Sequence, residues 1–254
     1  MLIGPQISPA DAALAARLAA LRAAIASAAA RADRTEESVT LIAVSKGHDA
    51  EHVRQACSLG IRDVGESYLQ EALAKRAALL DLPLVWHFIG RLQANKTRPI
   101  AEQFDWVHGV DRLHIAERLS AQRPATLPSL NICVQVSVAG EVGKGGVAPA
   151  ALAPLAAAIE RLPHLRLRGL MCILPAHLPP GANRPLFATL RDCLLRLNGS
   201  ASEPPTTRHL DTLSMGMSED FASAIAEGAT CIRIGTALFG PRQRPASPST
   251  AGLR

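Results

Sequence analysis

The chain has 254 residues, of which 48% are hydrophobic and 19% are charged, so it has enough apolar residues for a sizeable core and is not intrinsically disordered. A net charge of +5 is compatible with nucleic-acid binding, but the 27 basic residues are spread along the chain and only 3% of residues are aromatic. We therefore expect no nucleic-acid partner.

A helix is predicted near the N-terminus, from about residue 9 to residue 31. Residues 8–11 read Ser-Pro-Ala-Asp, which supplies an N-cap, a proline at the first helical position and an acidic residue in the first turn. Large apolar residues then recur at helical spacing, at Leu14, Leu18, Leu21 and Ile25. This stripe predicts that the helix packs on the rest of the protein.

Short apolar segments of strand type then alternate with longer helical segments as far as Gly240. The eight predicted strands are residues 41–45, 61–65, 84–89, 104–110, 131–139, 165–173, 209–214 and 231–235. The predicted helices between them include residues 50–59, 67–80, 113–121, 150–162, 185–197 and 218–228. Apolar strands joined by helices indicate a parallel sheet buried on both faces. Eight of them predict a single α/β domain, a (β/α)8 TIM barrel with an N-terminal helix preceding strand 1.

The rival fold is a doubly wound open sheet, which is disfavoured because no glycine-rich dinucleotide motif follows the first predicted strand. We predict one barrel domain over residues 1–240 and a flexible proline-rich tail over residues 241–254, since the sequence after Gly240 cannot continue a helix. The barrel would then lack its eighth helix. The N-terminal helix is expected to pack between the first and last strands in its place.

Lys46 directly follows the first predicted strand. In a parallel barrel the functional groups lie at the carboxyl ends of the strands, and an apolar setting there favours the neutral amine that a Schiff base requires. The alternative is a lysine that extends from the strand end to solvent, which is the commoner arrangement for an isolated lysine.

Two further strand ends combine a glycine with a hydroxyl group. Ser214 and Gly216 lie at the end of the seventh predicted strand, and Gly235 and Thr236 lie at the end of the eighth. Backbone N–H groups and hydroxyls of this kind can hold a phosphate. Such residues are also common in ordinary turns, but the seventh and eighth strands are the usual phosphate-binding pair in this fold.

Arg233 precedes this second pair by two residues and is expected inside the barrel or at its mouth. A cation in that position needs a partner. Either a pyridine nitrogen or a carboxylate, such as that of Asp211 or Glu66, could serve.

Several sequence strings, in order from about residue 39 to residue 240, resemble the pyridoxal phosphate homeostasis protein family, which is itself similar to the N-terminal barrel of alanine racemase. The strings are Ala43-Val44-Ser45-Lys46, Gly65-Glu66-Ser67-Tyr68, His87-Phe88-Ile89-Gly90 with Leu92-Gln93 and Asn95-Lys96, residues 213–218 with Asp220, and residues 233–237 with Phe239-Gly240.

The resemblance implies pyridoxal 5'-phosphate (PLP) as the cofactor, held as an internal aldimine on Lys46. It also implies that Arg233 faces the pyridine nitrogen. The implied phosphate-binding residues are Ser214, Gly216, Gly235 and Thr236. Ser67 would lie against the cofactor, where the family usually has asparagine. No catalytic residue and no metal ligand is assigned.

The resemblance further implies a PLP-binding protein of intracellular PLP and amino-acid homeostasis rather than an enzyme. An arginine beside the ring nitrogen weakens the electron sink that PLP catalysis uses. Related racemases take one of their two bases, a tyrosine, from a C-terminal domain, whereas the single tyrosine here is Tyr68. A PLP-dependent amino-acid racemase of the alanine racemase type is the alternative.

The five cysteines are odd in number and form no C-x-x-C motif, which favours buried thiols in a reducing compartment over disulfides or a zinc site. No signal-peptide pattern is apparent, and no uncharged apolar stretch is long enough to span a membrane. We expect a cytoplasmic monomer or weak dimer without membrane association. Besides PLP, its expected partners are PLP-dependent client enzymes.

Overall fold

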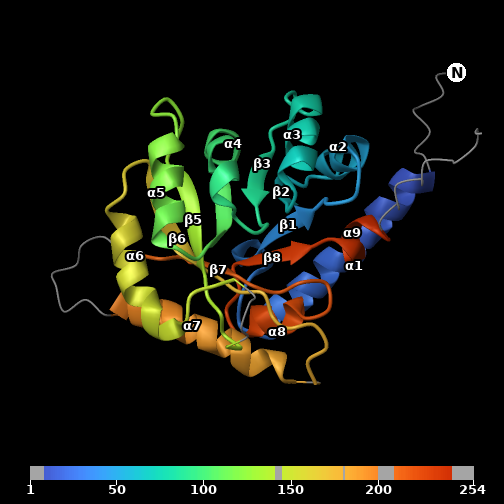
Figure 1. Ribbon diagram of the computed structural model, residues 1–254. Coiled ribbons are helices and arrows are strands. Elements are labelled where there is room, and N and C mark those ends of the chain that lie inside the picture. The colour runs from blue at the N-terminus through green and yellow to red at the C-terminus, as the bar shows by residue number, and fades with distance from the viewer. Residues whose placement is uncertain (1–8, 141–144, 180, 200–208, 242–254) are drawn as a thin grey trace, which may run out of the picture.

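Eight parallel strands form a closed barrel in sequence order, and β8 pairs with β1 to complete it (Figure 1). The computed structural model describes residues 9–140, 145–179, 181–199 and 209–241. The strands are β1 (Thr40–Val44), β2 (Asp63–Glu66), β3 (Val85–Phe88), β4 (Trp106–Val110), β5 (Leu130–Gln135), β6 (Leu165–Met171), β7 (Thr212–Ser214) and β8 (Cys231–Ile234). All eight predicted strands are present, so the predicted barrel is confirmed and the open sheet is excluded.

Each strand is followed by a helix on the outside of the barrel (Figure 1). These helices are α2 (Ala50–Ser58), α3 (Leu69–Ala78), α4 (Thr97–Gln103), α5 (Leu113–Gln122), α6 (Leu152–Glu160), α7 (Asn183–Gly199), α8 (Phe221–Ala226) and α9 (Thr236–Phe239). Short 3-10 helices cover Glu36–Ser38, Ala94–Lys96 and Pro149–Ala151. The sequence did not predict α4 and α9, which are the shortest of the outer helices apart from α8.

The prediction that the barrel lacks its eighth helix is wrong, because α9 follows β8. This helix is a single turn that ends at Gly240, where a φ of 87° is readily adopted only by glycine. The predicted tail lies outside the described residues from residue 242 onward.

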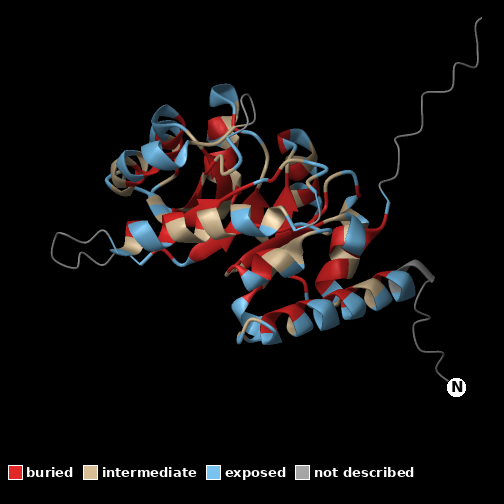
Figure 2. Cartoon of the chain, turned by 90° about the horizontal axis from the view of Figure 1, so that it is seen from below, coloured by how far each residue is buried: buried red, intermediate tan, exposed pale blue. Residues whose placement is uncertain are grey.

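The N-terminal helix α1 (Pro9–Ala30) packs on the barrel, but it contacts α8, α9 and α2 instead of taking the place of a missing helix between β8 and β1. It packs against α8 and α9, and the Arg17 Nε donates a hydrogen bond of 2.7 Å to the Leu238 carbonyl oxygen of α9. Figure 2 shows its buried face turned toward the barrel and its exposed face outward. Residues 12–30 are long and apolar enough to cross a membrane by length and composition, but their large apolar side chains are buried against the barrel.

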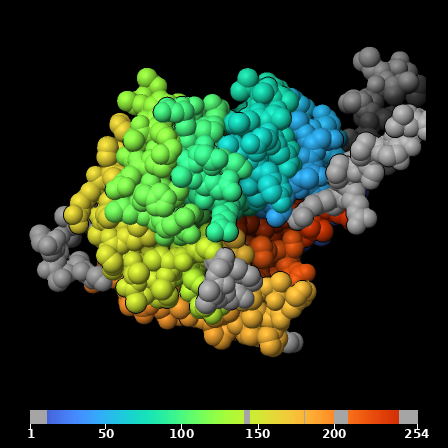
Figure 3. Space-filling model, in the orientation of Figure 1, coloured from blue at the N-terminus to red at the C-terminus, as the bar shows by residue number. Residues whose placement is uncertain are grey.

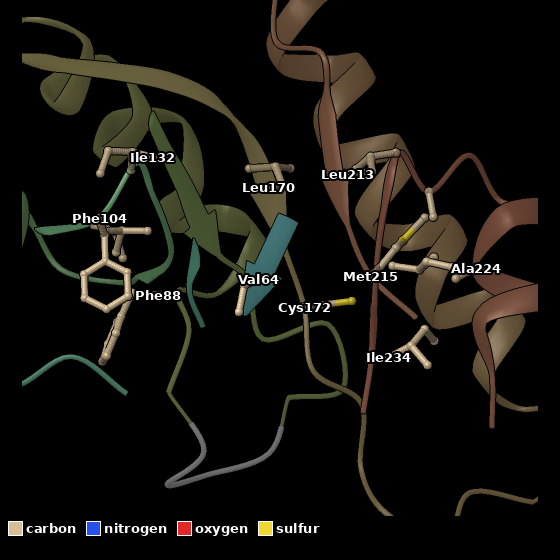
Figure 4. Close-up of a cluster of buried hydrophobic side chains, with 14 of the residues drawn as sticks. Val64, Phe88, Phe104, Ile132, Leu170, Cys172, Leu213, Met215, Ala224 and Ile234 are labelled. Carbon is tan, nitrogen blue, oxygen red and sulfur yellow. The ribbon is translucent and has the colours of Figure 1, made fainter. Parts of the chain in front are cut away.

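The main hydrophobic core lies between the strands and the surrounding helices. Figure 4 shows part of it, with Leu213, Met215 and Ala224 gathered where β7 faces α8. At another point Phe88 and Phe104 make an edge-to-face contact with ring centroids 5.3 Å apart. The space-filling view shows the C-terminal segment, in orange-red, between the blue N-terminal part and the gold part that precedes it (Figure 3). Closure of the barrel therefore places the first and last strand ends side by side.

Candidate functional site

A cavity of about 750 Å³ opens at the carboxyl ends of the strands. Its wall is built from residues at the ends of β1, β2, β3 and β8 and from the segments that follow β6 and β7. Five of the seven predicted site residues border it, namely Lys46, Ser67, Arg233, Gly235 and Thr236. They come from β8, β1 and β2, and β8 neighbours β1 only because the barrel closes.

Lys46 is half-buried at this wall, two residues after the end of β1. A second lysine, Lys75 of α3, holds the backbone before it, because the Lys75 Nζ donates a hydrogen bond of 2.6 Å to the Ser45 carbonyl oxygen. The Glu71 carboxylate holds the backbone after Lys46. It accepts a hydrogen bond of 2.6 Å from the Gly47 N–H and one of 2.7 Å from the Lys75 Nζ. Both peptide neighbours of Lys46 are therefore tied to α3.

Glu66 completes this network from the end of β2 and is fully buried. Its Oε1 accepts hydrogen bonds of 2.5 Å from both the Lys75 Nζ and the Ser45 hydroxyl. Burial raises the pKa of the Glu66 carboxyl, and the Lys75 ammonium opposes that shift. Lys75 was not predicted as a site residue, although its spacing of four residues from Glu71 on a predicted helix was a signal that the two could pair.

Arg233 lies on β8 with only 5% of its surface exposed, and it also borders the cavity. Its guanidinium donates a hydrogen bond of 2.8 Å to the Ser214 hydroxyl and one of 2.9 Å to the Cys172 carbonyl oxygen. Burial lowers the pKa of this guanidinium from its usual value. The sequence placed Arg233 inside the barrel or at its mouth, and it spans both.

The two carboxylates that the sequence offered as partners of Arg233 are taken by other cations. Asp211 forms a two-pronged pair with Arg168, at 3.0 and 2.7 Å, and Glu66 is paired with Lys75. Among the described residues, Arg233 forms no salt bridge within 4.0 Å. Neither of these two carboxylates therefore forms the internal ion pair with Arg233.

Ser214 and Gly216, the first predicted phosphate pair, do not border the cavity. The Ser214 hydroxyl is fully buried within the barrel, between Arg233 and His108. Gly216 has a φ of 95°, and a Cβ there would come within 2.7 Å of the Ala224 side chain of α8. Its glycine is thus required by backbone conformation and by the close approach of α8.

The neighbouring residues Met217 and Ser218 reach the cavity wall instead. The Asp220 carboxylate accepts a hydrogen bond of 2.6 Å from the Met217 N–H, which fixes this turn. Sequence reasoning missed both wall residues because β7 ends at Ser214 and the chain needs further residues to reach the mouth. The hydroxyl of Ser218, the second serine in residues 213–218, was the available sequence signal for a wall residue.

The groups around the cavity suit an anionic ligand with a reactive carbonyl. Arg233 supplies a cation, Ser218 and Thr236 supply hydroxyls, and Lys46 is the only lysine among the described wall residues. Burial raises the pKa of the nearby Cys172 thiol to about 12, so this thiol stays protonated and is a poor nucleophile. In the described parts of the chain, no group of three or more His, Cys, Asp or Glu side chains could hold a metal ion.

Comparison with known proteins shows which family this chain belongs to. Residues 16–243 match the family model described as alanine racemase, N-terminal domain. A pyridoxal phosphate homeostasis protein of Pseudomonas aeruginosa is 55% identical over 236 residues, which cover 93% of this chain and 99% of that protein. The chain belongs to the pyridoxal phosphate homeostasis protein family. Another member, from Escherichia coli K12, is 47% identical over 232 residues, which cover 90% of this chain and 97% of that protein.

Solved structures agree with this membership of the pyridoxal phosphate homeostasis protein family. PipY of Synechococcus elongatus PCC7942, solved with PLP bound, is 42% identical with a TM-score of 0.76, and the match covers 89% of this chain and all of PipY. Alanine racemase from Corynebacterium glutamicum is 15% identical with a TM-score of 0.66, and the match covers 91% of this chain and 62% of the racemase. At that identity the racemase shows a shared fold only.

Proposed function

We propose that this chain binds PLP in the cavity at the carboxyl ends of the strands and serves in intracellular PLP and amino-acid homeostasis. The observation that carries the proposal is the meeting of the Lys46 amine, the buried Arg233 guanidinium and the Gly235-Thr236 pair on one wall. That donor set fits PLP, which has an aldehyde, a pyridine nitrogen and a phosphate. The PLP-bound PipY structure supports the same ligand.

Each wall residue has a role in this proposal. Lys46 would hold the cofactor by condensing with its carbonyl and releasing water, Gly235, Thr236 and Ser218 would receive the phosphate, and Ser67 would lie beside the cofactor. Arg233 approaches the pyridine nitrogen. When bound, PLP supplies an electron-withdrawing ring and a carbonyl that condenses with amines.

Ser214 and Gly216 act indirectly in the revised assignment. The Ser214 hydroxyl accepts from the Arg233 guanidinium, and the Gly216 carbonyl oxygen accepts from the Arg233 backbone N–H at 3.0 Å. These two residues therefore hold Arg233 in place, and the direct phosphate contacts pass to Ser218 and the end of β8.

Holding the cofactor, rather than using it for catalysis, fits the site better. A permanently charged guanidinium near the ring nitrogen opposes its protonation and weakens the electron sink. Tyr68 is 62% exposed and does not border the cavity, so it does not supply the tyrosine base of a racemase.

Borohydride reduction of the PLP-loaded protein, followed by peptide mapping, tests this function. We expect the cofactor to be fixed on Lys46, and Lys46→Ala to lose the corresponding absorbance band while keeping its melting temperature. Lys96→Ala, outside the cavity wall, is the matched control and should keep the band. Labelling at a different lysine would overturn the assignment. Rapid exchange of the α-proton of L-amino acids in deuterated solvent would instead favour the racemase.

The wider proposals concern the cellular role. All five cysteines are buried and unpaired, which supports a reducing compartment such as the cytoplasm. Delivery of PLP to client enzymes would be tested by mixing the loaded protein with a PLP-free aminotransferase in the presence of a scavenger of free PLP. Analytical ultracentrifugation would test the proposed monomer or weak dimer.

A further inference from the structure

A chain of hydrogen bonds crosses the inside of the barrel from its far end to the cavity. It begins at the Asp63 carboxylate, at the start of β2, which contacts the His87 Nε2 at 2.9 Å. The His87 Nδ1 lies 3.0 Å from the His108 Nε2, and the His108 Nδ1 lies 2.8 Å from the Ser214 hydroxyl. The Ser214 hydroxyl accepts from Arg233 at 2.8 Å, so five strands contribute one residue each.

When each imidazole ring carries one proton, the two ends of this hydrogen-bond chain fix the direction of every bond between them. A guanidinium can only donate, and a carboxylate can only accept. With one proton on each ring, His87 donates from Nε2 to Asp63 and must accept at Nδ1. The His108 Nε2 then carries the proton, and its Nδ1 accepts from the Ser214 O–H. Every contact in the chain is satisfied in this single arrangement.

The opposite arrangement is disfavoured. If His87 carried protons on both nitrogens, His108 would have to accept at Nε2 and donate from Nδ1. The Ser214 oxygen would then accept from both His108 and Arg233, and its own O–H would have no acceptor in the chain. Burial, followed by the electrostatic influence of the neighbouring His87 and then of Arg233, lowers the pKa of the fully buried His108 well below its usual value, which keeps this ring neutral.

The middle of this hydrogen-bond chain is buried. The side chains of His108 and Ser214 have no exposed surface, and His87 has 2%. Trp106 stacks on the His87 ring at a centroid distance of 5.6 Å and a ring angle of 16°. The side chain of Asp63 is 29% exposed, so the one carboxylate in the chain is at the solvent-facing end.

We propose that Asp63, His87 and His108 are positioning residues that orient the Arg233 guanidinium toward the cavity. They do so by fixing the Ser214 oxygen as its acceptor, and the Asp63 carboxylate polarises the connected chain against the guanidinium charge. The inference rests on the proposed function for its consequence, since an Arg233 held in this way contacts PLP. The directions of the hydrogen bonds from Asp63 to Arg233 are a property of the protein without any ligand.

Long-range nitrogen-15 NMR of the imidazole rings in the ligand-free protein tests that order directly. Both His87 and His108 are expected to be neutral and protonated at Nε2, with Nδ1 as the acceptor. Assignment is made from the single variants His87→Gln and His108→Gln. Protonation at Nδ1 of either ring at neutral pH would overturn the proposal, whatever the protein binds.

PLP titration of variants tests the consequence. His108→Leu removes the acceptor of the Ser214 O–H, and we expect the Kd for PLP to rise by about tenfold with a shift of the bound absorbance band. Asp63→Asn keeps the size and an acceptor oxygen but removes the charge, so a smaller rise in the same direction is expected. His108→Gln, which can still accept and donate, should recover most of the affinity.

The matched control is Asp211→Asn. Asp211 lies at the same end of the barrel as Asp63, but it pairs with Arg168 and is not part of the hydrogen-bond chain. Equal Kd values and spectra for His108→Leu and Asp211→Asn would reduce His108 to a structural role and overturn the proposal. An unmutated protein that binds no PLP would overturn the proposed function instead, and the ring protonation measured without ligand would still decide the inference.

Discussion

The Lys75 ammonium lies 2.6 Å from the carbonyl oxygen of Ser45, the residue directly before Lys46. This contact makes a buried lysine on α3 part of the setting of the lysine that we assign to the cofactor. The Lys75 side chain is 5% exposed and Glu66 is fully buried, so the pair has little access to water. Each charge is therefore stabilised mainly by the other and not by water.

Replacing Lys75 with methionine leaves the buried Glu66 carboxylate without its cation. We expect the free energy of unfolding to fall by about 3 to 5 kcal/mol, the usual result of removing one partner of a buried pair. The affinity for PLP should fall as well, because the backbone at Ser45 loses its donor. Urea unfolding and PLP titration measure the two effects, with Lys96→Met as the control. Unchanged values in both experiments would contradict the role of Lys75.

Glu66 predicts a specific dependence of stability on pH. Burial raises the pKa of this carboxyl above its ordinary value of 4.5, so the folded protein binds the proton more tightly than the unfolded chain does. Its contribution to stability is therefore greatest below the ordinary pKa and declines as pH rises from there toward the folded-state pKa. Glu66→Gln should remove that decline, which urea midpoints of both proteins at several pH values above about 4.5 would show. Parallel curves would mean that Glu66 titrates normally.

Packing of α1 predicts a position-dependent effect of charge. Leu18 is 3% exposed, whereas Ala20 on the same helix is exposed. Leu18→Asp should lower the free energy of unfolding by at least about 3 kcal/mol, because it removes a buried apolar side chain and buries a charge. Ala20→Asp should cost well under about 1 kcal/mol, from helix propensity alone. Thermal unfolding of the two variants makes the comparison. Similar losses would mean that α1 is not anchored through this stripe.

Arg233 predicts the protonation state of bound PLP. Its guanidinium should keep the pyridine nitrogen unprotonated at neutral pH, since a second positive charge nearby is unfavourable. Arg233→Glu should let the nitrogen take up a proton and accelerate any slow exchange of amino-acid α-protons. Nitrogen-15 NMR of labelled PLP in the two proteins is the measurement. A protonated nitrogen in the unmutated protein would contradict the role given to Arg233 and strengthen the case for an enzyme.

The order of the elements was determined by the sequence on its own. A buried parallel strand must be apolar along its length, and each outer helix needs an apolar stripe, so both patterns are local and can be read from spacing. The same logic placed Lys46 at a strand end and Arg233 inside the barrel or at its mouth. The four-residue α9 and the seven-residue α4 were not predicted, because a helix of one or two turns shows little apolar periodicity.

Only the tertiary structure decided which polar groups meet. Lys75 reaches Ser45 from 30 positions away, and His108 reaches Ser214 from 106 positions away. Such pairings depend on how the barrel closes and on where each strand stops, and spacing along the chain carries no record of either. Because β7 ends at Ser214, the Ser214 hydroxyl lies inside the barrel and accepts from Arg233, whereas Ser218, four residues later, borders the cavity.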